Sequence, residues 1–131
     1  MNVYEAIGPD KLWKIIYSFY QKSFADPMLA HFFWNHDLDR LAKMQLAFVT
    51  SMLGGPAAYS GQSLAQAHAA LTIRMPHFQR RQKLLQETMD EEGLAPRLAK
   101  AWLAQEERLK PLIINGAQSC LEHPDPSKPR S

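Results

Sequence analysis

Hydrophobic residues near the N-terminus recur with the spacing of an α-helix. Across residues 12–24 the large apolar side chains fall three or four positions apart, and lysine, serine and glutamine occupy positions between them. This period is that of one helix face, so it predicts an amphipathic helix capped by Asp10. Asp26 and Pro27 form a second start signal, because proline fits the first helical turn. We therefore expect a short helix over Ala30–Phe33.

A third helix is predicted to begin after Asp37, whose side chain suits the N-cap position. One face of this segment repeats at intervals of three and four residues and is apolar except for one glutamine, which predicts a continuous buried stripe. The helix is expected to end at residues 54–56, where two glycines precede a proline that cannot continue it. The stripe consists of Leu38, Leu41, Gln45, Phe48 and Met52.

Two longer helices are expected in the second half of the chain. One spans residues 76–92 and ends at Gly93, and the other spans residues 96–116 with a kink at Pro111. The apolar face of the first of them carries Phe78, Leu85 and Met89. Since no segment alternates with period two, the predicted fold class is all-α.

The composition narrows the class of protein. The 131 residues suit one domain, which we expect over residues 1–118, followed by a disordered proline-containing tail over residues 119–131. The net charge is +2, with basic residues scattered among acids, which argues against nucleic-acid binding. No apolar stretch approaches the roughly 18 residues of a membrane span, and the N-terminus does not resemble a signal peptide. We expect a cytoplasmic protein, and the single cysteine, Cys120, agrees with a reducing compartment.

Polar residues within apolar stripes are the candidates for chemistry. Gln45 and Tyr20 each place a hydrogen-bonding group on a hydrophobic helix face, and a buried amide without a partner costs about 1–3 kcal/mol. Either residue can be an ordinary core side chain, or the two can converge on one ligand. His68, in the small-residue segment AQAHAAL, is either an ordinary histidine or a lone imidazole of the kind that binds haem iron.

Basic residues near the start of the long helix are expected to form a solvated face. One of them could pair with a haem propionate, but the sequence does not choose among them. These residues are Arg74, Arg80, Arg81 and Lys83.

Short segments in the first two thirds of the chain resemble the truncated haemoglobins. They occur in the family's order and at its spacings, with 13 residues from Tyr20 to Phe33, 12 from Phe33 to Gln45 and 23 from Gln45 to His68. The resemblance covers roughly residues 4–114, and leucine at position 41 with glutamine at 45 is most like the first of the family's groups. The segments are YEAIG, FY, DPML, HFF, DLDRL, Gln45, GGP-x-x-Y, AH at His68 and HF at His77 and Phe78.

The resemblance implies a two-over-two helical sandwich around haem b, with the iron bound by His68. It implies that Tyr20 and Gln45 are distal residues that donate hydrogen bonds to the ligand. Leu41 falls where animal globins carry a distal histidine, and Phe33 matches the phenylalanine that stacks on the haem. The other implied pocket residues are Phe19, Phe48, Ile73 and Phe78.

The function that the resemblance predicts is binding of oxygen, nitric oxide or carbon monoxide at the iron, with oxygen transport as one role. Hydrogen bonds to a partly negative ligand contribute roughly 1.5–3 kcal/mol each, or about 10- to 100-fold in affinity. One alternative is nitric oxide dioxygenation or peroxide chemistry at the same haem, with an external reductase as partner. The other is a haem-free helical interaction module in which the candidate residues belong to the core.

Overall fold

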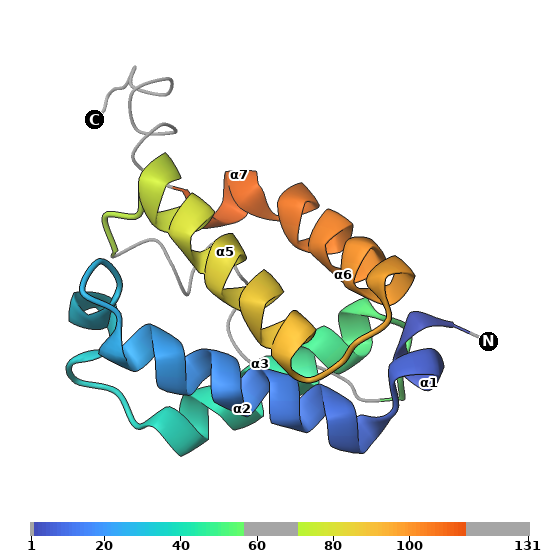
Figure 1. The fold of residues 1–131 in the computed structure, drawn as a ribbon. Helices are drawn as coiled ribbons and strands as arrows, with labels where there is room; N and C mark the ends of the chain where they lie inside the picture. The colour runs from blue at the N-terminus through green and yellow to red at the C-terminus, as the bar shows by residue number, and fades with distance from the viewer. Residues whose placement is uncertain (1, 57–70, 115–131) are drawn as a thin grey trace.

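The computed structural model describes residues 2–56 and 71–114, and every regular element in these two ranges is helical (Figure 1). None of these helices is both long enough and apolar enough to cross a membrane. The elements are α1 (Val3–Ile7), α2 (Pro9–Ala25), the 3₁₀ helix η1 (Ala30–Phe33), α3 (Leu38–Met52), α5 (Met75–Glu91), α6 (Pro96–Arg108) and α7 (Lys110–Ile113).

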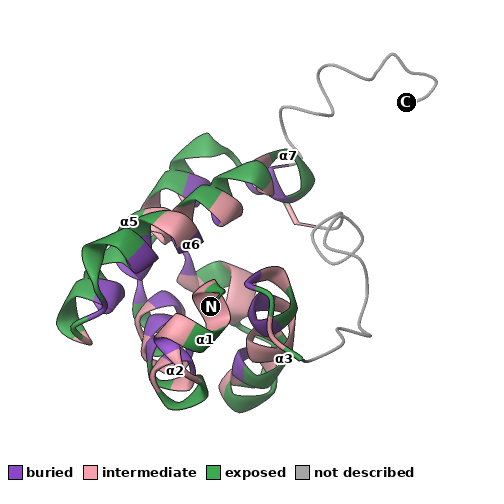
Figure 2. Cartoon of the chain, turned by 90° about the vertical axis from the view of Figure 1, so that its right-hand side faces the viewer, coloured by how far each residue is buried: buried purple, intermediate pink, exposed green. Residues whose placement is uncertain are grey.

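The four long helices form two pairs that pack on each other. Helix α2 packs against α3 and against α5, and α5 packs against α6 (Figure 1). The buried residues of these helices face the interior between the pairs, and the exposed residues face outward (Figure 2). This arrangement confirms the all-α fold class. The centre of the core contains Leu12, Ile15, Ile16, Ala42, Val49, Leu85, Met89 and Trp102.

The start of α2 differs from the prediction. Gly8 occupies the N-cap position with φ of +87°, Pro9 is the first helical residue, and Asp10 lies within the first turn without capping the helix. The predicted Asp10 cap is therefore wrong, because Pro9 has no N–H and its fixed φ already suits the helix start. The preceding helix α1 has only five residues, too few for a visible apolar period.

Helix α3 begins and ends where the sequence predicts, but its apolar stripe is only half-buried. Asp37 accepts a hydrogen bond from the Arg40 N–H at 3.0 Å, and Gly54 follows the helix with φ of +96°. The buried residues of α3 are Ala42, Val49 and Thr50, on a neighbouring face. The expected continuous buried stripe is therefore wrong, because the packed face of α3 uses small and β-branched side chains. The half-buried residues are Leu38, Leu41, Gln45, Phe48 and Met52.

The predicted helix over residues 96–116 is two helices. Helix α6 ends at Arg108, Leu109 lies between the helices, and Pro111 lies in the first turn of α7. A proline inside a helix removes a hydrogen bond and clashes with the preceding turn, so it marks a new helix start here rather than a kink. The predicted domain end at residue 118 and the tail lie outside the described residues.

Candidate ligand pocket

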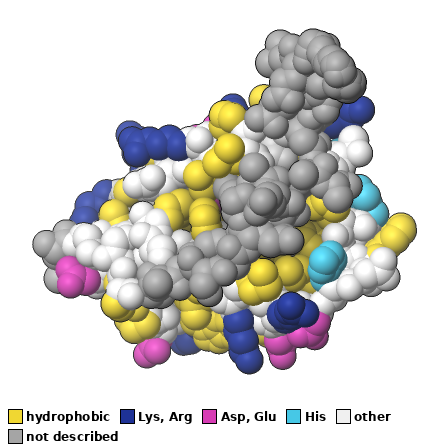
Figure 3. Space-filling view, turned by 180° about the vertical axis from the view of Figure 1, so that it is seen from behind, with side chains coloured by type: hydrophobic (Ala, Val, Ile, Leu, Met, Phe, Trp, Pro, Cys, Tyr) yellow, Lys and Arg dark blue, Asp and Glu magenta, His cyan; other side chains and the backbone are white. Residues whose placement is uncertain are grey.

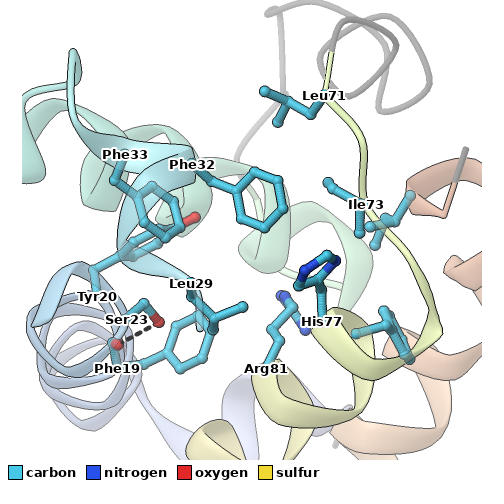
Figure 4. A pocket seen from close by; sticks show the side chains of 12 residues that line it. Phe19, Tyr20, Ser23, Leu29, Phe32, Phe33, Leu71, Ile73, His77 and Arg81 are labelled. Atoms are coloured by element: carbon cyan, nitrogen blue, oxygen red, sulfur yellow. Dashed lines mark hydrogen bonds between the residues drawn. The ribbon is translucent and has the colours of Figure 1, made fainter. Parts of the chain in front are cut away.

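An apolar pocket lies between the C-terminal half of α2, η1, the start of α5 and α7 (Figure 4). Its lining combines many apolar side chains with a few polar ones, as is typical of small-molecule sites. From behind, hydrophobic side chains gather across the middle of the molecule, with histidines beside them (Figure 3). The apolar residues of the pocket are Phe19, Leu29, Phe32, Phe33, Leu71, Ile73, Phe78 and Ile113, and the polar ones are Tyr20, Ser23, His77 and Arg81.

Aromatic contacts hold Tyr20 at the pocket wall. Its ring meets the edge of Phe33 with centroids 6.0 Å apart, and it contacts Phe19 at 5.4 Å. Phe33 in turn stacks on Phe24 at 4.7 Å. Edge-to-face and offset-stacked pairs of this kind restrict ring orientation. The neighbouring phenylalanine rings therefore hold the Tyr20 side chain in place at the pocket.

His77 lines the opposite side of the pocket and also caps α5. Its Nδ1 accepts a hydrogen bond from the Arg74 N–H at 3.0 Å, so the neutral imidazole carries its proton on Nε2. Phe32 meets the imidazole edge-on at 5.0 Å, and the ring of His31 lies 5.9 Å away. Burial lowers the pKa of His77, and the positive charges of His31 and Arg74 lower it further. His77 is therefore a neutral N–H donor beside the pocket.

Arg81 lies inside the pocket wall and not on a solvated face. Its side chain is 19% exposed, and Nη2 lies 2.9 Å from Oε1 of the buried Glu106. Its guanidinium also lies over the ring of Phe19, 5.2 Å from the centroid. The expected solvated face is therefore wrong for Arg81, because a carboxylate on α6 draws the side chain inward.

Arg80 keeps a partly solvated side chain, 40% exposed, and also pairs with a buried carboxylate. Its Nε donates to Asp26 at 2.9 Å, and the Asp26 side chain is 4% exposed. Arg74 and Lys83 are exposed, as predicted.

The structure brings together part of the predicted site. Five of the predicted residues line the pocket, whereas Leu41, Gln45 and Phe48 lie half-buried on α3 and are not among its lining residues. His68 lies outside the described residues, in which no cluster of three metal-binding side chains is present. The five residues are Phe19, Tyr20, Phe33, Ile73 and Phe78.

Sequence reasoning missed several lining residues. Phe32 and His77 belong to the HFF and HF segments, so their adjacency to predicted pocket positions is a usable signal. Arg81 is among the four basic residues of which one could pair with a propionate, but its inward position carries no local signal, because its partner Glu106 lies on another helix. The other missed residues are Ser23, Leu29, Leu71 and Ile113.

Comparison with known proteins places these features in a family. The family model of bacterial-like globins matches residues 2–115. The group 1 truncated haemoglobin of Tetrahymena pyriformis is 36% identical over 123 residues, which cover 93% of this chain and 89% of the relative.

Solved structures agree with the sequence match. The Tetrahymena pyriformis protein in its Fe(III) form superposes with a TM-score of 0.82 and 29% identity, covering 87% of this chain and 98% of that one. A truncated oxygen-avid haemoglobin from Bacillus subtilis superposes with a TM-score of 0.77 and 25% identity, covering 86% and 99%.

Proposed function

Since the chain belongs to the bacterial-like globin family and is a truncated haemoglobin, we propose that it binds haem b through His68 and takes up oxygen beside Tyr20 and Gln45. The observation that carries this proposal is the apolar pocket that gathers Tyr20 with Phe33, Ile73 and Phe78. A wall of phenylalanine and isoleucine suits a flat apolar macrocycle. When bound, haem supplies an iron with an open position for a diatomic gas.

His68 is the better iron ligand of the two histidines in question. His77 lines the pocket, but its Nδ1 is occupied by the Arg74 N–H and its Nε2 carries the proton, so it has no lone pair to offer. The choice of His68 is supported by its distance of 23 residues from Gln45, which is the spacing of the family. A neutral His68 would donate one nitrogen to the iron and its other N–H to a nearby acceptor.

The distal assignment is supported by solved variants of the Tetrahymena pyriformis protein. In those structures a tyrosine and two glutamines are replaced, at spacings of 21 and 4 residues, which are the spacings of Tyr20, Leu41 and Gln45 here. Leu41 therefore stands where that relative has a glutamine. In this chain Tyr20 and Gln45 remain as donors, and Leu41 adds apolar surface that excludes water.

The side-chain amide of Gln45 is available to donate a hydrogen bond to a ligand. Within residues 2–56 and 71–114 no side-chain hydrogen bond of its amide is formed, although the residue is half-buried. An amide N–H in this position would donate a charge-assisted hydrogen bond to a partly negative ligand. Oxygen is our choice of ligand because the similar Bacillus subtilis protein is described as oxygen-avid.

The iron ligand is tested by replacing His68 with alanine. Purified wild-type protein mixed with haem should show a Soret band that survives gel filtration, and His68→Ala should lose it. His36→Ala, at an exposed position, is the control and should retain haem. Equal haem retention by the His68 variant would remove this residue from the ligand role, and a wild-type chain without a Soret band would refute haem binding.

The distal tyrosine is tested by Tyr20→Phe in the oxygenated protein. Loss of one hydrogen bond to a partly charged ligand should speed oxygen release about 10- to 100-fold. Tyr17→Phe removes a hydroxyl that bonds Asp39 at 2.8 Å, away from the pocket, and should leave the rate unchanged. An unaltered off-rate in Tyr20→Phe would show that its hydroxyl does not reach the ligand.

A further inference from the structure

We propose that Arg81 makes the pocket a binding site for small inorganic anions, such as azide or nitrite, to which its guanidinium would donate hydrogen bonds. This inference rests on the proposed haem function and adds a class of ligand to it. Arg81 and Tyr20 line the same pocket, and the Arg81 side chain rises from α5 into it (Figure 4). A guanidinium offers N–H donors to an anion and has no acceptor.

The position of Arg81 is fixed by a buried carboxylate. Glu106 is 1% exposed, its Oε1 lies 2.9 Å from Arg81 Nη2, and its Oε2 accepts a hydrogen bond from Trp102 Nε1–H at 3.1 Å. The indole thus orients the carboxylate, and the carboxylate orients the guanidinium. Arg81 also donates from Nη1 to Gln82 at 2.6 Å.

The Arg81 guanidinium keeps N–H donors that its contacts with Glu106 and Gln82 do not use. A guanidinium has five N–H groups, and the contacts with Glu106 and Gln82 use two of its three nitrogens. The guanidinium carbon lies over the ring of Phe19, 5.2 Å from its centroid, and this cation–π contact also holds the group in the pocket wall. The arrangement therefore presents fixed cationic donors in the wall of the pocket that Tyr20 also lines.

A purely structural ion pair is a poor explanation for this placement. Burying two charges costs more than packing apolar side chains of the same volume, and replacing such pairs by hydrophobic residues is often neutral or stabilising. Most side chains of the pocket that Arg81 lines are phenylalanine, leucine or isoleucine, so an aliphatic residue would suit this wall. Retaining a charge there is explained if the charge acts on a ligand.

The negative charge of Glu106 limits how strongly Arg81 attracts an anion. Its negative charge offsets that of Arg81, so neutral gases enter a pocket with little net field, while an anion gains direct hydrogen bonds. Removing each partner should therefore have opposite effects on anions. Without Arg81 the anion loses its donors, and without the Glu106 charge it meets an uncompensated cation.

The test compares anion and gas binding in haem-loaded protein. Azide affinity of the ferric form and carbon monoxide affinity of the ferrous form are measured by absorption titration for wild type, Arg81→Met, Arg81→Lys and Glu106→Gln. We expect Arg81→Met to weaken azide at least tenfold and leave carbon monoxide within twofold. Arg81→Lys should keep part of the azide affinity, and Glu106→Gln should raise it. Lys83→Met removes a charge from the exposed side of α5 and is the matched control.

The outcomes separate ligand binding from a structural role. If azide and carbon monoxide weaken together in Arg81→Met, or if Glu106→Gln lowers azide affinity as much as Arg81→Met does, the pair only supports the fold and the proposal is wrong. A loss of azide affinity in the Lys83 control would assign the effect to overall charge and also overturn it. Failure of the wild type to retain haem would instead refute the proposed function.

Discussion

The titration of His77 links the pocket wall to solution pH. Burial and the positive charges of His31 and Arg74 keep the pKa of His77 below its ordinary value of 6.5. As pH falls below 6.5, the unfolded chain therefore takes up a proton before the folded one does, and stability that is present above this pH is lost. Protonation of Nδ1 also removes the acceptor of the Arg74 N–H at the start of α5.

Replacing His77 with asparagine tests this coupling. The asparagine oxygen can still accept from the Arg74 N–H, but it does not titrate, so the variant should lose less unfolding free energy between about pH 7 and pH 5 than the wild type. Urea unfolding followed by circular dichroism at the two pH values measures the difference. His36→Asn, at an exposed position, should keep the wild-type dependence. An unchanged slope in the His77 variant would contradict the assignment.

Asp26 contributes a second pH effect in a more acidic range. The hydrogen bond from Arg80, aided by the backbone N–H of Met28, lowers the pKa of Asp26 below 3.8. A depressed carboxyl pKa gives stability that is present above the unfolded value and lost as pH falls through the folded one.

The Asp26 effect is tested with asparagine at this position. Asp26→Asn should cost about 1 kcal/mol at neutral pH, because Arg80 is partly exposed and the ion pair is screened. The variant should also flatten the loss of stability below about pH 4. Thermal unfolding at several pH values measures both, and Asp90→Asn, at an exposed site, should behave as wild type. Equal acid sensitivity of the two variants would argue against the pair.

At the scale of elements, hydrogen bonds link the short helix α1 and its N-cap residue to the end of α3. Asn2 caps α1 by accepting from the Glu5 N–H at 2.8 Å, and its Nδ2 donates to the Gly54 carbonyl at 2.8 Å. The Tyr4 N–H adds a hydrogen bond to the Leu53 carbonyl at 3.1 Å. One side chain thus serves as a helix cap and as a link between two elements.

Removal of this link should destabilise the fold measurably. Asn2→Ala should cost about 0.5–2 kcal/mol, the usual range for loss of an N-cap, measured by chemical denaturation. Glu5→Gln keeps an oxygen that accepts from the Asn2 N–H, and it should cost much less. A loss in Asn2→Ala that is no larger than the loss in Glu5→Gln would contradict the role of the Asn2 side-chain contacts.

The sequence predicts best those helix ends that are determined by residues close by in the chain. Asp37, Gly54 and Gly93 mark helix ends because capping and positive φ depend on neighbouring residues, and the structure confirms them. The inward turn of Arg81 was not predictable in this way, because Glu106 reaches it from another helix. The same holds for the buried face of α3, where packing against α2 selects Ala42 over the larger residues of the stripe.

At the scale of the whole molecule, the pocket lies where a large and a small hydrophobic cluster meet. The large one fills the space between the helix pairs, and the small one consists of Ile73, Phe78, Ile113 and Ile114. Phe32 packs against both clusters. A ligand in the pocket would therefore add contacts between two parts of the core that share few side chains of their own.

This arrangement predicts where haem should stabilise the chain most. A ligand at 100 times its dissociation constant adds about 2.7 kcal/mol, or 100-fold protection, to openings that expose its site. Hydrogen exchange measured with and without haem should thus slow most in residues 110–114 and 73–78, beside the small cluster, and least in α1, which is remote from the pocket lining. His68→Ala should remove the difference. Equal slowing throughout the chain would mean that haem stabilises only global folding and does not join the two clusters.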